Sequence, residues 1–228
     1  MDAVQTSGPK PLARPYAGVS ATDRVASRRE RLLEAGLELY GTRGFAATGV
    51  KDVCRRARLT DRYFYESFRD SAELFTAVFD RATSDLLARV ARKVGEVPPE
   101  PESQVRASIE TFVRALAADP RKARVVLVES TSAGAEVDRH IRASLRQFAG
   151  LVATTARRHL PEMPERLLVL GSLSLVGAIE RVIIEWQDGY LDATIEEVID
   201  HLVQLFLIAG ASVGVSPRTG QSRHDDSA

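Results

Sequence analysis

The chain has 228 residues, 44% of them hydrophobic and 27% charged, which allows a substantial core and excludes wholesale disorder. Its formal charge is zero, but residues 1–69 carry 13 Lys and Arg against 8 Asp and Glu, whereas residues 70–228 carry 18 against 23. This asymmetry favours a basic end that meets a polyanion, although scattered surface charge would give the same count.

The single cysteine, Cys54, excludes an intrachain disulfide and a thiolate metal cluster, and it favours a reducing, cytoplasmic location. Residues 1–22 resemble neither a secretion signal nor a membrane anchor. The most apolar stretch, residues 167–179, is too short to span a membrane and runs into Glu180 and Arg181. We therefore interpret this stretch as a helix buried in protein, and we expect no membrane partner.

Apolar residues at helical spacing predict a first helix from about Thr22 to Tyr40, which Gly41 and Gly44 should end. Phe45 is then expected to fold back into the core. Thr48 is the expected N-cap of a second helix. The apolar side of that second helix consists of Val50, Val53, Cys54 and Ala57.

A third helix should begin after Thr60 as its N-cap, with Leu59 filling the turn before it. Phe64 and Phe68, four residues apart, give this helix an inward face. A fourth helix starts near Asp70 or Ser71 and continues to about residue 94, which is longer than a small module needs. It is therefore expected to connect two parts of the chain.

The rest of the sequence also predicts helices, and no segment is typical of a strand. The stretch GEVPPEPES separates the fourth helix from those that follow, and Gly189 suits a turn between the last two. The predicted helices cover residues 105–116, 123–129, 141–152, 165–187 and 193–213. The expected fold class is therefore all-α.

Four stretches carry a resemblance to a known family. They are YGTRGFAATGV at the end of the first helix, the turn ARLT, the aromatic helix DRYFYESF, and RDSAELF at the start of the fourth helix. In this order they resemble the DNA-binding domain of TetR-family transcriptional regulators. The resemblance covers residues 28–81 in detail, and the helical plan of the remainder is compatible with it.

This resemblance implies an N-terminal three-helix DNA-binding domain with a helix-turn-helix, followed by a C-terminal helical bundle for ligand binding and dimerisation. On that basis we expect a flexible arm over residues 1–22 and the DNA-binding domain over 23–69. The ligand-binding and dimerisation domain should cover 70–214, and a disordered tail 215–228. Arg24, Arg28 and Arg29 are interpreted as a solvated helix start, with a minor-groove arm that includes Lys10 and Arg14 as the alternative.

The third helix is the expected recognition helix, because a helix-turn-helix lays the N-terminal residues of its second helix along base edges in the major groove. Arg62 is the expected base reader, since arginine reaches O6 and N7 of guanine. Tyr65 matches the family's phosphate-contacting tyrosine. The expected DNA-binding residues are Thr48, Lys51, Arg58, Thr60, Asp61, Arg62, Tyr63, Tyr65, Glu66 and Ser71.

Two positions depart from the family pattern. Arg58 stands where the tight turn usually has glycine, at a strain of about 1 kcal/mol if its φ is positive; either the turn differs locally, or the arginine contacts phosphate. Ser71 stands where a lysine is common, so one phosphate contact is weaker or neutral. The chain has no asparagine, so guanine contacts, thymine methyl groups and DNA shape must carry specificity.

The last two predicted helices are apolar over more than one face, so a second copy of the chain should cover them. A homodimer through residues 165–213 would place two recognition helices about 34 Å apart. The resemblance also implies a small-molecule pocket in the bundle. Its candidate lining residues, for each of which core packing is the simpler explanation, are Phe112, Leu116, Phe148, Val152, Ser174 and Ala178.

Enzyme chemistry has little support in the sequence. There is no glycine-rich phosphate loop, the histidines lack metal-ligand spacing, and Cys54 has no evident base partner, so no cofactor or metal is expected. His140 is interpreted as a solvated helix residue, and Cys54 as a packing residue, with a redox sensor as the alternative.

We therefore predict a homodimeric DNA-binding regulator, a repressor that binds a palindromic operator and is released by a small, mainly apolar effector. Activator action remains a second interpretation. The alternative from another class is a helical small-molecule-binding or scaffold dimer whose helix-turn-helix no longer binds DNA.

Overall fold

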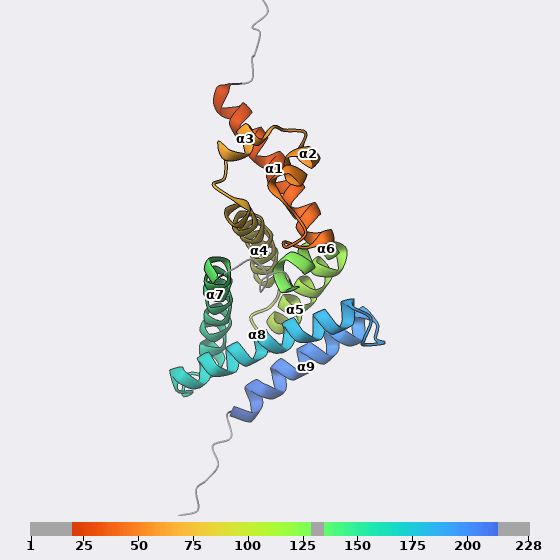
Figure 1. Cartoon of the computed structure of the whole chain (residues 1–228). Coiled ribbons are helices and arrows are strands. Elements are labelled where there is room, and N and C mark those ends of the chain that lie inside the picture. The colour runs from red at the N-terminus through yellow and green to blue at the C-terminus, as the bar shows by residue number, and fades with distance from the viewer. Residues whose placement is uncertain (1–19, 129–134, 214–228) are drawn as a thin grey trace, which may run out of the picture.

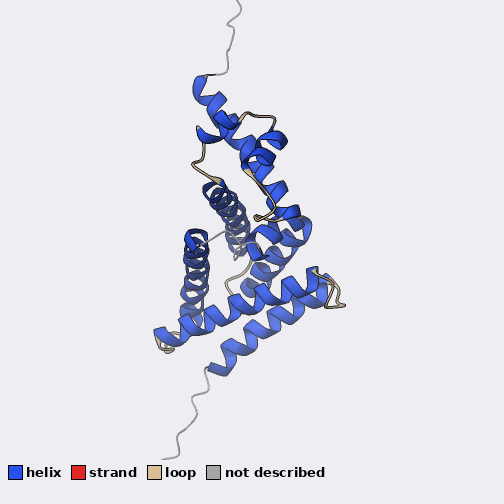
Figure 2. Ribbon diagram, in the orientation of Figure 1, coloured by secondary structure: helices blue, strands red, loops and turns tan. Residues whose placement is uncertain are grey.

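The computed structural model describes residues 20–128 and 135–213, and all regular structure in these ranges is helical (Figure 2). The all-α class expected from the sequence is therefore confirmed. Most of the expected arm with Lys10 and Arg14, the expected tail, and Glu129 at the end of the predicted short helix lie outside the described residues.

The described residues form α-helices and one π-helix. These are α1 (Ala21–Arg43), α2 (Val50–Ala57), α3 (Asp61–Tyr65), α4 (Ser71–Gly95), α5 (Pro101–Ala118), α6 (Pro120–Ala123), the π-helix η1 (Arg124–Val128), α7 (Ala135–His159), α8 (Glu165–Gln187) and α9 (Ile195–Val213). Figure 1 shows α1, α2 and α3 at one end of the molecule and the long pair α8 and α9 at the other, with α4, α5 and α7 between them.

The ends of α1 and α2 differ in two details from the sequence prediction. Gly41 lies inside α1, and the helix ends only at Gly44, whose φ of 89° needs a residue without a side chain. Thr48 is not the N-cap of α2. Gly49 occupies that position, and its N–H donates to the Asp52 carboxylate at 3.2 Å.

The N-terminal core forms where the aromatic residues of α1, α3 and α4 meet. Phe64 and Phe68 are both buried, as their spacing predicted. Phe45 packs against the rings of Tyr40 and Phe75, with centroids 5.6 and 5.3 Å apart, so it does fold back into the core. The same buried cluster continues past residue 69 into the first half of α4 and into residues of η1 and α7.

A second buried cluster joins α4, α5, α8 and α9, with α5 packed on α9 and α7 packed on α8. His140 helps to hold α7 against α4: its Nε2 lies 2.6 Å from Oδ1 of Asp80, and its ring meets the edge of Phe79. The interpretation of His140 as a purely solvated helix residue is therefore wrong.

The short segment after α5 begins earlier than predicted, at Pro120, and continues as a π-helix rather than an α-helix. It lies directly against the end of α1. A Cβ atom added to Gly41 would lie 2.5 Å from Cβ and 2.6 Å from Cα of Arg121. The absence of a side chain at Gly41 therefore lets α6 and α1 approach closely.

Candidate functional site

The turn between α2 and α3 has a left-handed residue at its centre. Arg58 has φ 53° and ψ 46°, and it is the one residue other than glycine with positive φ in the described parts of the chain. The carbonyl groups around it are satisfied from α1, because Arg31 donates to the carbonyl oxygens of Ala57 at 2.6 Å and Arg58 at 3.0 Å. The turn thus keeps the family geometry at the cost of strain at an arginine.

Two side chains of α3 project to solvent because Phe64 of this helix and Phe68, three residues past its end, point inward. The side chain of Arg62 is 84% exposed and Tyr65 is 60% exposed. Lys51 on α2 and Thr60 at the start of α3 are also exposed, and Thr60 has the extended backbone of an N-cap without a side-chain cap bond. These four residues form a surface that can meet phosphates and base edges.

Neighbouring side chains of α3 are engaged within the protein. Glu66 accepts from Nε of Arg62 at 3.1 Å and lies 3.7 Å from the guanidinium of Arg28. Arg28 also sits over the half-buried ring of Tyr63, 4.4 Å from its centroid. Glu66 therefore orients Arg62, and Tyr63 stacks under an α1 arginine instead of projecting freely.

Of the arginines at the start of α1, Arg24 and Arg29 are exposed, as expected for a solvated helix start, and Arg28 is half-buried. Arg29 lies over the ring of Phe68, with its guanidinium carbon 4.7 Å from the centroid, just as Arg28 lies over Tyr63. Such contacts between a cation and a ring tie the start of α1 to α3.

Three other residues expected to bind DNA make contacts within the protein. Thr48 is only 6% exposed and donates its hydroxyl to the carbonyl of Gly44 at 2.8 Å. Ser71 is half-buried, and its carbonyl accepts from the hydroxyl of Tyr40 at 3.3 Å. Asp61 is exposed, but its carboxylate also pairs with the thiol of Cys54.

The environment of Cys54 argues against the redox-sensor alternative. Burial raises the pKa of this thiol to about 11, and the hydrogen bond and charge of Asp61 act in the same direction. A thiol that stays protonated at neutral pH is a poor nucleophile towards oxidants. Packing against α1 and α3 therefore accounts for Cys54.

The six residues expected to line a ligand pocket are only partly brought together. Phe112 of α5 and Phe148 of α7 do meet, with ring centroids 6.0 Å apart. Leu116 is buried in the core between α5 and α9, and Val152 and Ala178 are half-buried. Ser174 is exposed and donates its hydroxyl to the carbonyl of Leu170 in its own helix, so a single chain does not enclose it.

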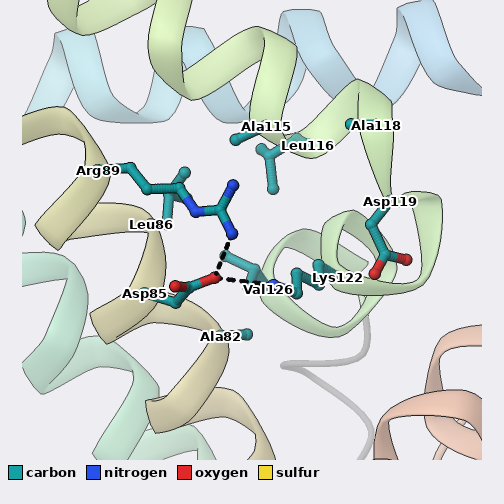
Figure 3. A pocket seen from close by; sticks show the side chains of 10 residues that line it. All are labelled: Ala82, Asp85, Leu86, Arg89, Ala115, Leu116, Ala118, Asp119, Lys122 and Val126. Atoms are coloured by element: carbon teal, nitrogen blue, oxygen red, sulfur yellow. Dashed lines mark hydrogen bonds and ion pairs between the residues drawn. The ribbon is translucent and has the colours of Figure 1, made fainter. Parts of the chain in front are cut away.

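A cavity of about 190 Å³ lies elsewhere, between α4, α5, α6 and η1 (Figure 3). Its walls include Leu86, Leu116 and Val126, and Figure 3 shows Arg89 and Lys122 both directed at the carboxylate of Asp85. Lys122 lies 2.8 Å and Arg89 3.1 Å from Oδ2 of Asp85, and hydrogen bonding from Lys122 lowers the pKa of that carboxyl group.

Of the predicted pocket residues only Leu116 lines this cavity. The sequence signal for the charged residues of this cavity was weak. Asp85 and Arg89 form an ordinary pair four residues apart on α4, and Lys122 is 37 positions further along the chain than Asp85. No group of three His, Cys, Asp or Glu that could hold a metal ion occurs within residues 20–128 and 135–213.

The far end of the molecule exposes a large apolar surface on α8 and α9. Leu170 is 59% and Ile208 60% exposed, and Leu167, Val169 and Leu173 are exposed as well. By length and composition alone, the whole of α8 is long and apolar enough to span a membrane, whereas residues 167–179 by themselves are too short. Only 17% of the most apolar window of α8 is buried. Glu180, within the same helix, has a pKa raised by burial.

The fold and the displayed α3 residues define a class of protein, the helix-turn-helix DNA-binding regulators with an added helical domain. Residues 32–78 match the family described as bacterial regulatory proteins, tetR family. This match identifies the helix-turn-helix part of the chain as that of a TetR-family transcriptional regulator. The recognition made from the sequence is therefore confirmed.

Solved structures share this fold over most of their length. FadR from Bacillus subtilis, solved in complex with stearoyl-CoA, is 13% identical, with a TM-score of 0.69 over 79% of this chain and 98% of that one. A TetR-like regulator from Rhodococcus sp. RHA1 is 20% identical, with a TM-score of 0.65 over 83% and 97%. AibR, solved with isovaleryl coenzyme A and operator DNA, is 17% identical, with a TM-score of 0.61 over 78% and 97%.

Proposed function

We propose that the protein is a cytoplasmic repressor that binds a palindromic operator as a homodimer and leaves it when a small, mainly apolar effector binds. The observation that carries this proposal is the orientation of α3, in which buried Phe64 and Phe68 hold Arg62 and Tyr65 out to solvent. Arg62 is assigned to a guanine edge, while Tyr65, Lys51, Thr60 and Arg58 are assigned to phosphates.

The proposed dimer forms through residues 165–213, because α8 and α9 carry the exposed leucines and isoleucine. A second copy would cover this surface, and two-fold symmetry would present two α3 helices to successive major grooves. Within each chain, we assign DNA binding to residues 23–69, and ligand binding and dimerisation to residues 70–214.

The apolar surface gives a direct test of the dimer. Leu170→Glu would place a charge within the proposed interface, whereas Leu151→Glu changes a similarly exposed leucine on α7 outside it. Sedimentation equilibrium should show a dimer for the parent and for Leu151→Glu, and a monomer for Leu170→Glu. A parent that sediments as a monomer contradicts the proposed interface.

An acyl group suits the proposed effector. Two proteins with this fold were solved with stearoyl-CoA and isovaleryl coenzyme A, which supports an acyl compound as the class of effector here. Such a ligand would have to favour one conformation of the dimer over another, with a typical coupling of about 1 to 3 kcal/mol.

Operator binding separates the regulator from a scaffold that has lost DNA binding. Duplexes selected by the protein from a random pool should converge on a palindrome, and the affinity for that palindrome should fall steeply with salt as phosphate contacts release counterions. Selection without convergence, together with no salt-dependent binding to any duplex, would favour the scaffold alternative.

A further inference from the structure

The cavity between α4, α5, α6 and η1 has an excess of cationic donors at its charged side. Lys122 and Arg89 both point at one carboxylate, that of Asp85 (Figure 3). The second carboxylate in the lining, Asp119, accepts from Nε and Nη2 of Arg121 at 2.9 Å each, so it is already occupied by its own partner. Two cations therefore share one acidic group.

Both cations have donors to spare. An ammonium group has three N–H donors and a guanidinium has five, and the contacts to Asp85 use one nitrogen of each side chain. A second carboxylate can join or replace Asp85 at these donors, with the strong hydrogen bonds that form between charged partners. The charged side of the cavity is thus suited to an anion.

Apolar side chains complete the lining beside the charged ones, and the space is small. Leu86, Leu116 and Val126 contribute there, and the volume is about 190 Å³. An engineered apolar cavity of about 150 Å³ holds a molecule the size of benzene. A ligand with about six carbon atoms fits this space if its anionic group lies next to its chain.

We propose that this cavity binds a short-chain carboxylate, whose anionic end is held by Lys122 and Arg89 and whose chain lies against Leu86 and Leu116. The carboxylate must adjoin the chain, because the cations and the apolar walls line one small space. The phosphates of a coenzyme A thioester lie a long linker away from the acyl chain and do not meet this requirement.

A ligand in the cavity would affect an ion pair that joins two helices. Lys122 on α6 and Asp85 on α4 hold these helices together, and an added carboxylate competes with Asp85 for Lys122. The same segment touches the DNA-binding end: Arg121 packs on Gly41, and Arg124 of η1 donates to the carbonyl of Thr42 at 3.1 Å. The π-helix that forms one wall is a type of turn that is frequent at functional sites.

The effect on DNA rests on the proposed function, but ligand binding does not. Titration calorimetry on the full-length protein would use hexanoate, hexanamide, hexanoyl-CoA and coenzyme A as probes. We expect hexanoate to bind at least tenfold more tightly than hexanamide, which matches it in size but lacks the charge. Equal affinity for acid and amide, or binding of hexanoyl-CoA without binding of hexanoate, would overturn the proposal.

Variants locate the site. Lys122→Gln and Arg89→Gln should each weaken hexanoate at least tenfold, whereas Asp85→Asn should bind it at least as tightly as the parent because the competing carboxylate is gone. Lys93→Gln is the matched control, since Lys93 pairs with Glu96 at the far end of α4. Thermal melts identify any variant that fails to fold. If a cation variant does not fold, Asp85→Asn still tests the proposal, because tenfold weaker hexanoate binding in that variant contradicts the proposed competition.

The two proposals fail separately. Selection of an operator by the ligand-free protein tests DNA binding, and hexanoate affinity tests the cavity. If hexanoate binds and the operator is selected, hexanoate should weaken the complex in the parent but not in Lys122→Gln. A complex that is unaffected by saturating hexanoate would overturn the regulatory part of this inference.

Discussion

The guanidinium of Arg31 on α1 donates to the backbone carbonyl of Ala57, the last residue of α2, at a distance of 2.6 Å. A second bond from the same nitrogen reaches the next carbonyl, that of Arg58. Carbonyl groups at the end of a helix lack hydrogen-bond donors within that helix. Arg31 supplies donors to two of these carbonyls, at the point where the chain turns towards α3. The arginine therefore supports the position of the recognition helix without touching it.

Arg31→Met keeps the aliphatic stem and removes these two bonds. We expect it to lower the free energy of unfolding by about 1.5 to 3 kcal/mol, the usual range for hydrogen bonds to a charged group. Urea denaturation measures the loss, and Arg146→Met, an exposed arginine on α7, is the control. Equal stability of the two variants would show that water replaces Arg31 at no cost.

Arg58→Gly should stabilise the fold and weaken DNA binding. A left-handed conformation costs an ordinary residue about 1 to 2 kcal/mol, and the greater freedom of glycine in the unfolded chain offsets part of the gain, so a net gain of up to about 1 kcal/mol is expected. Binding to a selected duplex should weaken in proportion to one lost phosphate contact. Unchanged DNA affinity at higher stability would remove Arg58 from the interface.

Arg62→Ala and Tyr65→Phe should affect DNA binding in different ways. Loss of a guanidinium from a guanine edge costs about 1 to 3 kcal/mol at one base position and relaxes specificity there. Loss of the Tyr65 hydroxyl should weaken all duplexes alike. Affinities for the selected palindrome and for single-base changes in it separate the two effects, and a uniform loss in Arg62→Ala would contradict base reading.

Gly41→Ala and Gly150→Ala form a matched pair of helix substitutions. A methyl group at Gly41 would meet the backbone of Arg121, whereas nothing lies within 4 Å of a Cβ placed at Gly150 on α7. We expect Gly41→Ala to cost about 1 to 3 kcal/mol and Gly150→Ala to add about 0.5 to 1 kcal/mol. Thermal and urea unfolding report both, and a stabilising Gly41→Ala would show that α6 is easily displaced from α1.

The Cys54 thiol predicts a particular dependence of stability on pH. Burial raises its pKa from about 9 to about 11 on folding, so the folded state holds this proton where the unfolded state has lost it. The contribution is complete below about pH 9 and is lost as the pH rises towards 11, with about 1.4 kcal/mol gone at pH 10.

Cys54→Ala removes this term, so the difference in stability between parent and variant should shrink by that amount from pH 7 to pH 10. Urea unfolding at both pH values gives the comparison. A difference that stays constant would show that the native thiol titrates near its ordinary value and would reopen the redox alternative.

The sequence predicted well those features that depend on local chemistry and spacing. The bounds of α8, Glu165–Gln187, agree with the prediction, because Pro164 opens the helix and Gly189 adopts the positive φ that ends it. The burial of Phe64 and Phe68 follows from their spacing. Arg58 adopts the left-handed turn, which the family pattern implied and its residue type opposed.

Other features depend on packing between distant segments, and no local signal determines them. Gly41 lies inside α1 and directly against α6, although glycine commonly ends a helix. The hydroxyl of Thr48 bonds to Gly44 within the loop, so Gly49 takes over the N-cap position. The cavity forms only when Asp85 and Lys122 meet across α4 and α6, which is why the predicted lining residues missed it.

Helix α4 is long enough to connect the start of the second domain with the cavity. Its 25 residues span about 37 Å, and its first turn is fixed through Asp70, which accepts from the N–H of Glu73 and directly follows the recognition segment. Asp85 lies just past the midpoint of α4, so a rotation of this helix by about three degrees around Asp85 would move its N-terminal end by about 1 Å. A change at Asp85 can therefore alter the position of the helix end that adjoins α3, with no change in the residues proposed to read DNA.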